Sequence, residues 1–180
     1  HGAAGQIANG LESMYNSRRD PNRQAAGKFF LKGAVMARSH QIRSLGVFSS
    51  GGDSQGMNAA VRAVVRTALN EGLDIYAIYE GYEGMIRGGD YIRKLSWDDV
   101  GGILHQGGTV IGSARSAAFR TFEGRMEAAF NLVTRDIDAL VCIGGDGSLS
   151  GANEFRQEWP QLLSALVSAG RINQEMADAH

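Results

Sequence analysis

The residues best suited to chemistry lie in the stretch 141–152, V-C-I-G-G-D-G-S-L-S-G-A. An apolar run over residues 139–143 ends at two glycines and predicts a buried parallel strand followed by a tight turn. Asp146 comes next, a hard oxygen ligand for Mg²⁺, and Ser148 is a good N-cap for a helix. The amides at such a helix start attract phosphate, and a metal ion would separate that phosphate from the carboxylate. The stretch predicts a site for a metal-bound nucleoside phosphate, although the same turn is also typical of a plain strand-to-helix connection.

Two further glycine-rich turns are predicted beside strands. Residues 45–49 form a short β-type run that ends at the turn 50–53, S-G-G-D, and a helix over residues 56–70 follows. Residues 107–113, G-G-T-V-I-G-S, are expected to form another strand and turn. The carboxyl ends of parallel strands meet at one sheet edge. We therefore expect three turns to gather there and to handle phosphoryl groups: those at Gly51, Gly107 and Gly144.

Basic side chains accompany these turns. Arg115 and Arg120 follow the turn at 107–113, and a guanidinium group suits bidentate recognition of phosphate oxygens. Arg62 and Arg66 lie four residues apart and therefore share one face of the predicted helix. Taken by themselves, these arginines are typical of a solvated surface.

The middle of the chain adds a possible base-stacking residue. A second strand is predicted at 75–79, and the glycine-rich segment 80–90 is expected to be a loop at its carboxyl end. Tyr82 in that segment would either stack on a nucleotide base or cover a hydrophobic edge. Ser96, with an aspartate three residues later, resembles a capping box that starts a helix through Leu104.

The remaining periodicity fixes the fold class. Helical spacing is found at 123–134, 148–159 and 161–169, and Asn173 should cap one more turn. Strands that alternate with helices in this way predict an α/β protein with a three-layer α/β/α arrangement and a mostly parallel sheet. Residues 1–43 lack a sustained period and are expected to be a flexible or loosely docked extension.

Composition excludes several classes of function. The chain is 43% hydrophobic and 21% charged, with a net charge of -1, which is typical of a globular protein and gives no reason to expect nucleic acid or a membrane as partner. Cys142 is the one cysteine, so no internal disulfide forms, and a reducing compartment is expected. Its place in an apolar strand predicts a core residue rather than a nucleophile.

Five motifs, in order, resemble the ATP-dependent 6-phosphofructokinase family. They cover the chain from about residue 45 to its end, and Gln55 and the stretch around Trp159 look like the eukaryotic, animal-type form rather than the bacterial one. The motifs are Ser50-Gly51-Gly52-Asp53 with Gly56-Met57-Asn58-Ala59-Ala60, Glu80-Gly81-Tyr82, Gly107-Gly108-Thr109, Gly112-Ser113-Ala114-Arg115 and Gly144-Gly145-Asp146-Gly147-Ser148.

The resemblance implies a glycolytic kinase of the cytoplasm that transfers the γ-phosphoryl group of ATP to the 1-hydroxyl of fructose 6-phosphate. It also implies Mg²⁺ as cofactor, allosteric effectors, and a tetramer of full-length subunits. Residues 44–180 would then be the ATP-binding part of an incomplete, Rossmann-like large domain, truncated at its C-terminal end.

Functional residues carry over position by position. Arg115 would stabilise the charge of the transferring group, Asp146 would hold Mg²⁺, and Arg62 and Arg66 match positions that bind effector phosphate in bacterial members. The residues implied in ATP binding are Gly51, Tyr82, Arg115, Arg120, Asp146, Gly147, Ser148 and Gly151. At Gly147 the pyrophosphate-using relatives usually carry an aspartate, so the glycine favours ATP as donor.

The family's catalytic segment, with the aspartate that acts as general base, is absent from these 180 residues and would lie beyond His180. The chain alone is therefore expected to be inactive. An alternative is a non-catalytic, effector-binding half of a duplicated chain, although such a half would not need Gly51, Arg115, Asp146 and Gly147 together. NAD and diacylglycerol kinases share a Gly-Gly-Asp-Gly turn but would not be expected to supply the Gly51 and Arg115 motifs. A dinucleotide-binding oxidoreductase is disfavoured because no G-x-G-x-x-G follows the first strand.

Overall fold

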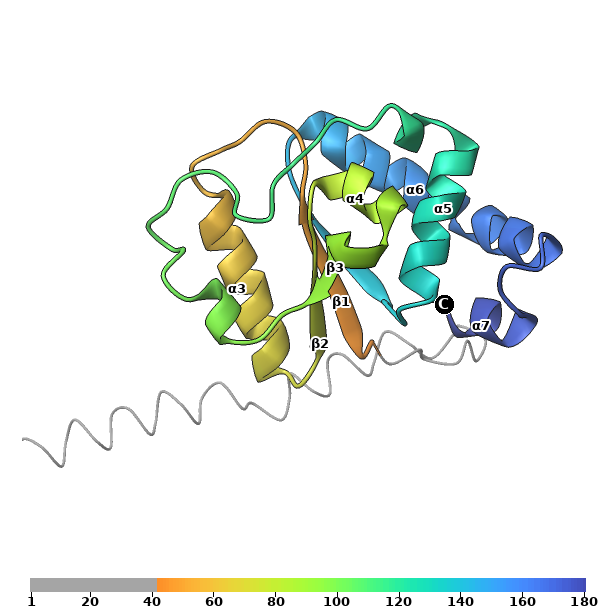
Figure 1. The fold of residues 1–180 in the computed structure, drawn as a ribbon, viewed down its shortest axis with the longest axis horizontal. Helices are drawn as coiled ribbons and strands as arrows, with labels where there is room; N and C mark the ends of the chain where they lie inside the picture. Colours follow the sequence, from red (N-terminus) through yellow and green to blue (C-terminus); the bar gives the residue numbers. More distant parts are fainter. Residues whose placement is uncertain (1–41) are drawn as a thin grey trace, which may run out of the picture. The chain divides into compact units, whose positions relative to one another are not determined.

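The computed structural model describes residues 42–180, which fold around a four-stranded sheet in the order β3-β2-β1-β4 (Figure 1). Strand β1 pairs in parallel with both β2 and β4, whereas β3 pairs antiparallel with β2. The sheet is therefore mostly parallel, as predicted. The expectation for residues 1–43 falls almost entirely outside the described residues. The strands are β1 (Ser44–Ser49), β2 (Asp74–Ile78), β3 (Ile92–Lys94) and β4 (Ala139–Ile143).

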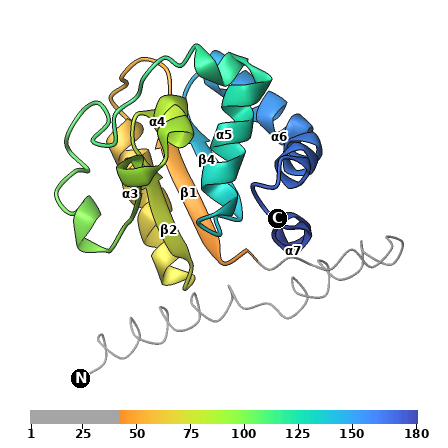
Figure 2. The same cartoon turned by 45° about the vertical axis from the view of Figure 1, so that its right-hand side comes forward.

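Helices cover both faces of the sheet, which confirms the three-layer prediction (Figures 1 and 2). On one face α3 (Met57–Asn70) packs its buried residues Val61 and Val65 against Val47 and Ile75. The other face carries a second core that includes Phe48 and Ile78 of the sheet. Its helices are α4 (Gly81–Arg87), α5 (Phe122–Val133) and α6 (Asp146–Ser168).

The register of the parallel strands brings two glycine turns level with each other. Val47 of β1 is paired with Ala77 of β2, and Ser49, the last residue of β1, is paired with Ile143, the last residue of β4. The neighbouring strands β1 and β4 therefore end at the same level of the sheet. This is the edge at which open α/β sheets bind ligands.

Side-chain caps define two helix starts, of which the one at Asn173 was predicted. Thr121 accepts a hydrogen bond from the Gly124 amide at the start of α5, and Asn173 accepts one from the Met176 amide at the start of α7 (Gln174–Ala179). Gly72, with φ of 76°, follows α3, and glycine in this left-handed conformation commonly ends a helix. Helix α6 differs from the prediction because it is continuous through Pro160, and Ser148 lies inside its first turn instead of capping it. Pro160 is exposed and lacks one backbone hydrogen-bond donor. The helix of 23 residues nevertheless continues on both sides of it.

The prediction of a loop at residues 80–90 is wrong. The structure has α4 there, followed by a 3-10 turn over Gly89–Tyr91 that leads into β3, a strand that was not predicted. The glycines serve close packing: a Cβ at Gly84 would lie 1.7 Å from the Tyr79 carbonyl oxygen. Glycine content alone therefore gave a misleading signal for this helix.

The prediction of a strand at 107–113 is also wrong, because residues 101–117 form an irregular loop without strand pairing. The predicted pairing of Ser96 with Asp99 is confirmed, since the Ser96 amide and hydroxyl both donate to the Asp99 carboxylate at 2.6 Å. These bonds lower the pKa of Asp99 below its usual range. The helix that they start is only the 3-10 turn Asp98–Val100 and does not reach Leu104.

Strand β4 is less buried than predicted. All five of its residues, Cys142 among them, are partly exposed, because within residues 42–180 the strand has a neighbour, β1, on one side only. In the same part of the chain, no helix is both long enough and apolar enough to cross a membrane.

Candidate functional site

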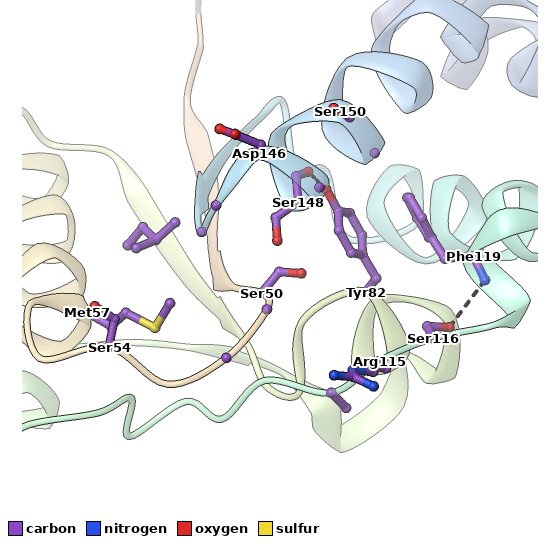
Figure 3. Close-up of a pocket in the computed structure, with 18 of the residues that line it drawn as sticks. Ser50, Ser54, Met57, Tyr82, Arg115, Ser116, Phe119, Asp146, Ser148 and Ser150 are labelled. Carbon is purple, nitrogen blue, oxygen red and sulfur yellow. Dashed lines mark hydrogen bonds between the residues drawn. The ribbon is translucent and has the colours of Figure 1, made fainter.

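A cavity of about 1130 Å³ opens at the carboxyl ends of β1 and β4 (Figure 3). Its walls come from the turn after β1, the loop 114–120, the start of α6 and one residue of α4. The sequence-predicted nucleotide residues all line this one cavity: Gly51, Tyr82, Arg115, Arg120, Asp146, Gly147, Ser148 and Gly151. The fold therefore brings together residues that are spread over 101 positions from Gly51 to Gly151.

The turns after β1 and β4 are in direct contact at the floor of the cavity. The Ser50 amide donates a hydrogen bond of 2.9 Å to the Ile143 carbonyl, which continues the sheet pairing by one step. A Cβ at Gly144 would lie 2.5 Å from the Ser50 carbonyl oxygen and 2.8 Å from the Ser148 hydroxyl. Glycine is required at this position because any side chain would push the two turns apart.

The start of α6 offers two amide hydrogens to the cavity. Among residues 42–180, no protein acceptor receives a hydrogen bond from the amides of Asp146 or Gly147. Amides of this kind, at the positive end of a helix of 23 residues, favour an anion such as phosphate. Gly147 is exposed, and a Cβ added to it would contact nothing within 4 Å, so the space beside these amides is open.

The start of α3, in contrast, has little capacity left for phosphate. The Met57 amide donates to the Ser54 carbonyl, and the Asn58 amide donates to the Gly108 carbonyl at 3.1 Å. The predicted phosphate turn after β1 can therefore offer the amides of Gly51 and Gly52 rather than those of the helix.

The loop that carries Arg115 is fastened to the turn after β1 by side chains. The Ser113 hydroxyl donates to the Gly51 carbonyl at 2.7 Å. The Ser49 hydroxyl lies 2.6 Å from that of Thr109 and donates to the Gly112 carbonyl at 2.9 Å. These contacts set the separation between the Gly51 turn and Arg115, which is exposed and available to an anion.

Asp146 and Arg115 lie on opposite sides of the cavity, with Ser50 and Ser148 between them (Figure 3). The cavity therefore has the Asp146 carboxylate at one rim and the Arg115 guanidinium at the other, and Arg120 and the carboxylate of Glu154 also line it. Among residues 42–180, no group of three or more His, Cys, Asp or Glu could hold a metal by itself. A single carboxylate such as Asp146 could hold Mg²⁺, which is usually bound through one or two carboxylates together with substrate phosphates and water.

Tyr82 is a buried wall residue. Its ring stacks on Phe119 with 4.0 Å between centroids and meets Phe48 edge-on at 4.9 Å. Its hydroxyl donates to the Ser148 carbonyl at 2.6 Å. A row of aromatic rings continues from Phe119 through Phe155 to Trp159, with centroids 5.4 and 5.3 Å apart. Because one face of the Tyr82 ring is already occupied, its contacts favour the hydrophobic-edge alternative over base stacking.

Arg125 is a site-supporting residue that sequence reasoning missed. Its side chain is 6% exposed and forms two hydrogen bonds with Glu158 of α6, at 2.7 and 2.9 Å, and one of 3.0 Å with the Phe119 carbonyl. It therefore joins α5, α6 and the 3-10 turn Ala118–Arg120 that ends the arginine loop. The hydrogen bond to Glu158 raises the pKa of Arg125. No spacing in the sequence pairs Arg125 with a residue 33 positions away.

Arg62 and Arg66 do not line this cavity. The guanidinium of Arg66 lies 4.2 Å from the ring centroid of Trp97, a cation–π contact, and its Nε is buried without a hydrogen-bond partner in residues 42–180. Any site that these two arginines form is therefore separate from the cavity.

Comparisons with known proteins agree with the motifs. Residues 44–176 match the family model of phosphofructokinase. The alpha subunit of ATP-dependent 6-phosphofructokinase from Saccharomyces cerevisiae is 56% identical over 141 residues, which are 78% of this chain and 14% of that protein. ATP-dependent 6-phosphofructokinase 1 of Caenorhabditis elegans is 59% identical over 130 residues, 72% of this chain and 16% of the relative.

A solved structure of phosphofructokinase from Saccharomyces cerevisiae superposes with a TM-score of 0.73 at 58% identity, covering 74% of this chain and 18% of that one. The chain thus spans less than a fifth of the length of each of these proteins. Its sequence motifs, its sheet and the family match lead to one conclusion: the chain belongs to the phosphofructokinase family.

Proposed function

We propose that this chain is the ATP-binding part of a glycolytic 6-phosphofructokinase subunit. The subunit transfers the γ-phosphoryl group of ATP to the 1-hydroxyl of fructose 6-phosphate and releases ADP and fructose 1,6-bisphosphate. The relatives are named ATP-dependent 6-phosphofructokinases, and this chain covers 14 to 16% of the two compared above. We therefore assign the complete reaction to the subunit and expect no turnover by the 180 residues alone.

The observation that carries the proposal is the convergence of all eight expected nucleotide residues on one cavity. The cavity combines unpaired amides at the start of α6, the glycine turn after β1 and two exposed arginines. Phosphoryl transfer depends mainly on positioning and on neutralising the charge of the phosphates, and these groups suit that task. Arg115 is proposed to stabilise the transferring group, and Arg120 to hold the nucleotide phosphates.

Mg²⁺ is the proposed cofactor, and Asp146 would hold it. When bound, the ion would neutralise phosphate charge and orient the transferring group. The carboxylate is exposed at the rim of the cavity, next to amides that would bind phosphate, so metal and phosphate would share one site. Without the ion, the Asp146 carboxylate would repel a phosphate bound at those amides.

Further properties of the subunit are proposed from the family likeness. They are a cytoplasmic location, a tetramer of full-length subunits and regulation by allosteric effectors. The Arg62 and Arg66 face of α3 is the proposed effector-phosphate site, and it is separate from the ATP cavity.

Calorimetric titration of the chain with ATP, with and without Mg²⁺, tests the binding part of the proposal. We expect binding that Mg²⁺ strengthens, and Asp146→Asn should remove that dependence on Mg²⁺. Asp90→Asn is the matched control, because Asp90 is also exposed but lies outside the cavity. ATP binding that is equally strong with and without Mg²⁺, or an Asp146→Asn variant that behaves like the control, would contradict the metal assignment.

The reaction itself is tested in the subunit that carries this chain, by following fructose 1,6-bisphosphate with a coupled assay. Product formation that requires ATP and fructose 6-phosphate supports the kinase. A subunit that binds ATP but forms no product would instead support the effector-binding alternative.

A further inference from the structure

Asn58 is a buried polar residue, 1% exposed, in the first turn of α3. Its side-chain amide donates to two successive carbonyls, those of Gln106 at 3.1 Å and Gly107 at 3.2 Å. Its side-chain oxygen accepts a hydrogen bond of 2.7 Å from the Val110 amide. The Asn58 main-chain amide adds a fourth bond, to the Gly108 carbonyl. Asn58 thus forms hydrogen bonds with four of the five residues of the segment 106–110.

This segment leads directly to the groups that face the cavity. The Ser49 hydroxyl is bonded to Thr109 within the segment and to Gly112 beyond it, and the Ser113 hydroxyl donates to the Gly51 carbonyl. Arg115 follows two residues later and lines the cavity. Because residues 101–117 have no strand pairing, side-chain bonds of this kind largely determine the position of the loop.

We propose that Asn58 is a positioning residue for Arg115. It does not line the cavity, and it acts by anchoring the start of the arginine loop to the helix that follows the β1 turn. The inference rests on the proposed function, because it assumes that Arg115 contacts the transferring phosphoryl group. Its claim about the loop can nevertheless be tested without any catalysis.

Asparagine has the one side chain of its size that can make this set of bonds. Two carbonyls require donors on one side of the group, and the Val110 amide requires an acceptor on the other. Aspartate would direct a carboxylate oxygen at the two carbonyls, and alanine would remove all three bonds, which lie in a partly buried place. The segment 106–110 would then lose its fixed position while the sheet remained paired.

Hydrogen exchange of the full chain measures the loop directly. In Asn58→Ala we expect the Val110 amide and the surrounding peptide to exchange about 10- to 100-fold faster, since three hydrogen bonds are lost. Amides of β1 and β2 should keep their rates. Unchanged exchange at Val110 would overturn the proposal whether or not the protein is a kinase.

Steady-state kinetics of the subunit then test the link to Arg115. A displaced arginine loses contact with the transition state more than with bound substrate, so Asn58→Ala should lower kcat by about 10- to 100-fold while KM for ATP changes only a few-fold. Ser113→Ala, which removes one exposed bond in the same loop, should move kcat in the same direction by a smaller factor. If Asn58→Ala does not fold, Asn58→Asp, which keeps an acceptor for the Val110 amide and removes only the two donors, replaces it in both measurements.

Asn131 provides a matched control. Its side-chain amide also donates to two successive carbonyls, those of Met85 at 3.0 Å and Ile86 at 2.7 Å, but it fastens the end of α4 and not the arginine loop. Asn131→Ala should lower thermal stability without the selective loss in kcat. If Asn131→Ala and Asn58→Ala lower kcat equally, Asn58 has only a general structural role and the positioning proposal fails.

Discussion

The hydroxyl of Tyr82 in α4 donates a hydrogen bond of 2.6 Å to the main-chain carbonyl of Ser148 in the first turn of α6. The two residues are 66 positions apart and are both buried. The bond fixes the helix end whose amides point to the cavity. Burial raises the pKa of Tyr82, with a smaller contribution from Cys142, so this hydroxyl remains a donor at any working pH.

Replacing Tyr82 with phenylalanine tests that bond. We expect Tyr82→Phe to lower the free energy of unfolding by about 1 to 2 kcal/mol, because a buried bond is lost, and to weaken ATP binding several-fold. Urea denaturation and calorimetry measure the two effects. In Tyr91→Phe the lost partner is the exposed Arg87, so stability should change much less than in Tyr82→Phe. Equal effects of the two variants would contradict a special role for Tyr82.

Substitutions at Gly147 test the choice of phosphoryl donor. Gly147→Ala should fold and bind ATP almost normally, because a Cβ there meets no atom within 4 Å. Gly147→Asp should fold equally well but weaken ATP use by more than about tenfold, since a second carboxylate beside Asp146 repels the nucleotide phosphates. Kinetics with ATP and thermal unfolding separate the two effects. If ATP kinetics in Gly147→Asp match those of Gly147→Ala, the charge argument is wrong.

Arg125 should be among the most stabilising polar residues of the described chain. Arg125→Leu leaves Glu158 and the Phe119 carbonyl without their donor, and we expect a loss of about 3 kcal/mol in the free energy of unfolding. Removing Glu158 as well, in Arg125→Leu with Glu158→Leu, should restore part of that loss. Arg87→Leu is the control, because its pair with Glu83 is exposed and should contribute little to stability. Chemical denaturation that ranks the two arginines equally would refute this account.

Cys142 should react slowly with alkylating reagents in the folded chain. Burial raises the pKa of this thiol, and the weaker opposing effect of the Tyr82 hydrogen bond does not cancel it. At pH 7.5 the thiol is therefore protonated, and iodoacetamide should label it more slowly than a free cysteine. Because the raised pKa belongs to the folded state, the stability that it contributes is lost as pH rises above the ordinary thiol range. Labelling as fast as in urea would contradict the prediction.

The sequence predicts the layers and most helices of the fold because hydrophobic spacing and capping residues are local signals. Thr121 and Asn173 start helices through bonds to amides three residues later. The prediction fails where contacts between distant residues determine the local structure. Gly84 is a glycine because of its close contact with Tyr79 and does not mark a loop. Residues 107–113 bond to the side chains of Ser49 and Asn58 instead of forming a strand. The partial exposure of β4 depends on which strands lie beside it, and a local pattern does not contain that information.

The same contrast between local signals and distant contacts applies to the candidate site. The turns at Gly51 and Gly144, Asp146, Arg115 and Arg120 were recognisable by residue type and motif, and they do meet in one cavity, whereas the third predicted turn, at Gly107, does not line it. The contacts of Arg125 and Asn58 were not recognisable, although Asn58 belongs to one of the motifs, because Arg125 pairs with Glu158, 33 positions away, and Asn58 bonds to Gln106, 48 positions away. Neither residue type nor spacing marks such a contact before the chain is folded.

The aromatic row that starts at the cavity wall has an optical consequence. The chain has two tryptophans: Trp159 ends the row that runs from Tyr82, and Trp97 lies under the guanidinium of Arg66. Indole emission responds to its immediate surroundings, so each tryptophan is a built-in fluorophore for a different region. Replacing either one with phenylalanine leaves a single emitter. The binding that we propose in the cavity and at the Arg66 surface would then give two separate signals from the same unlabelled protein.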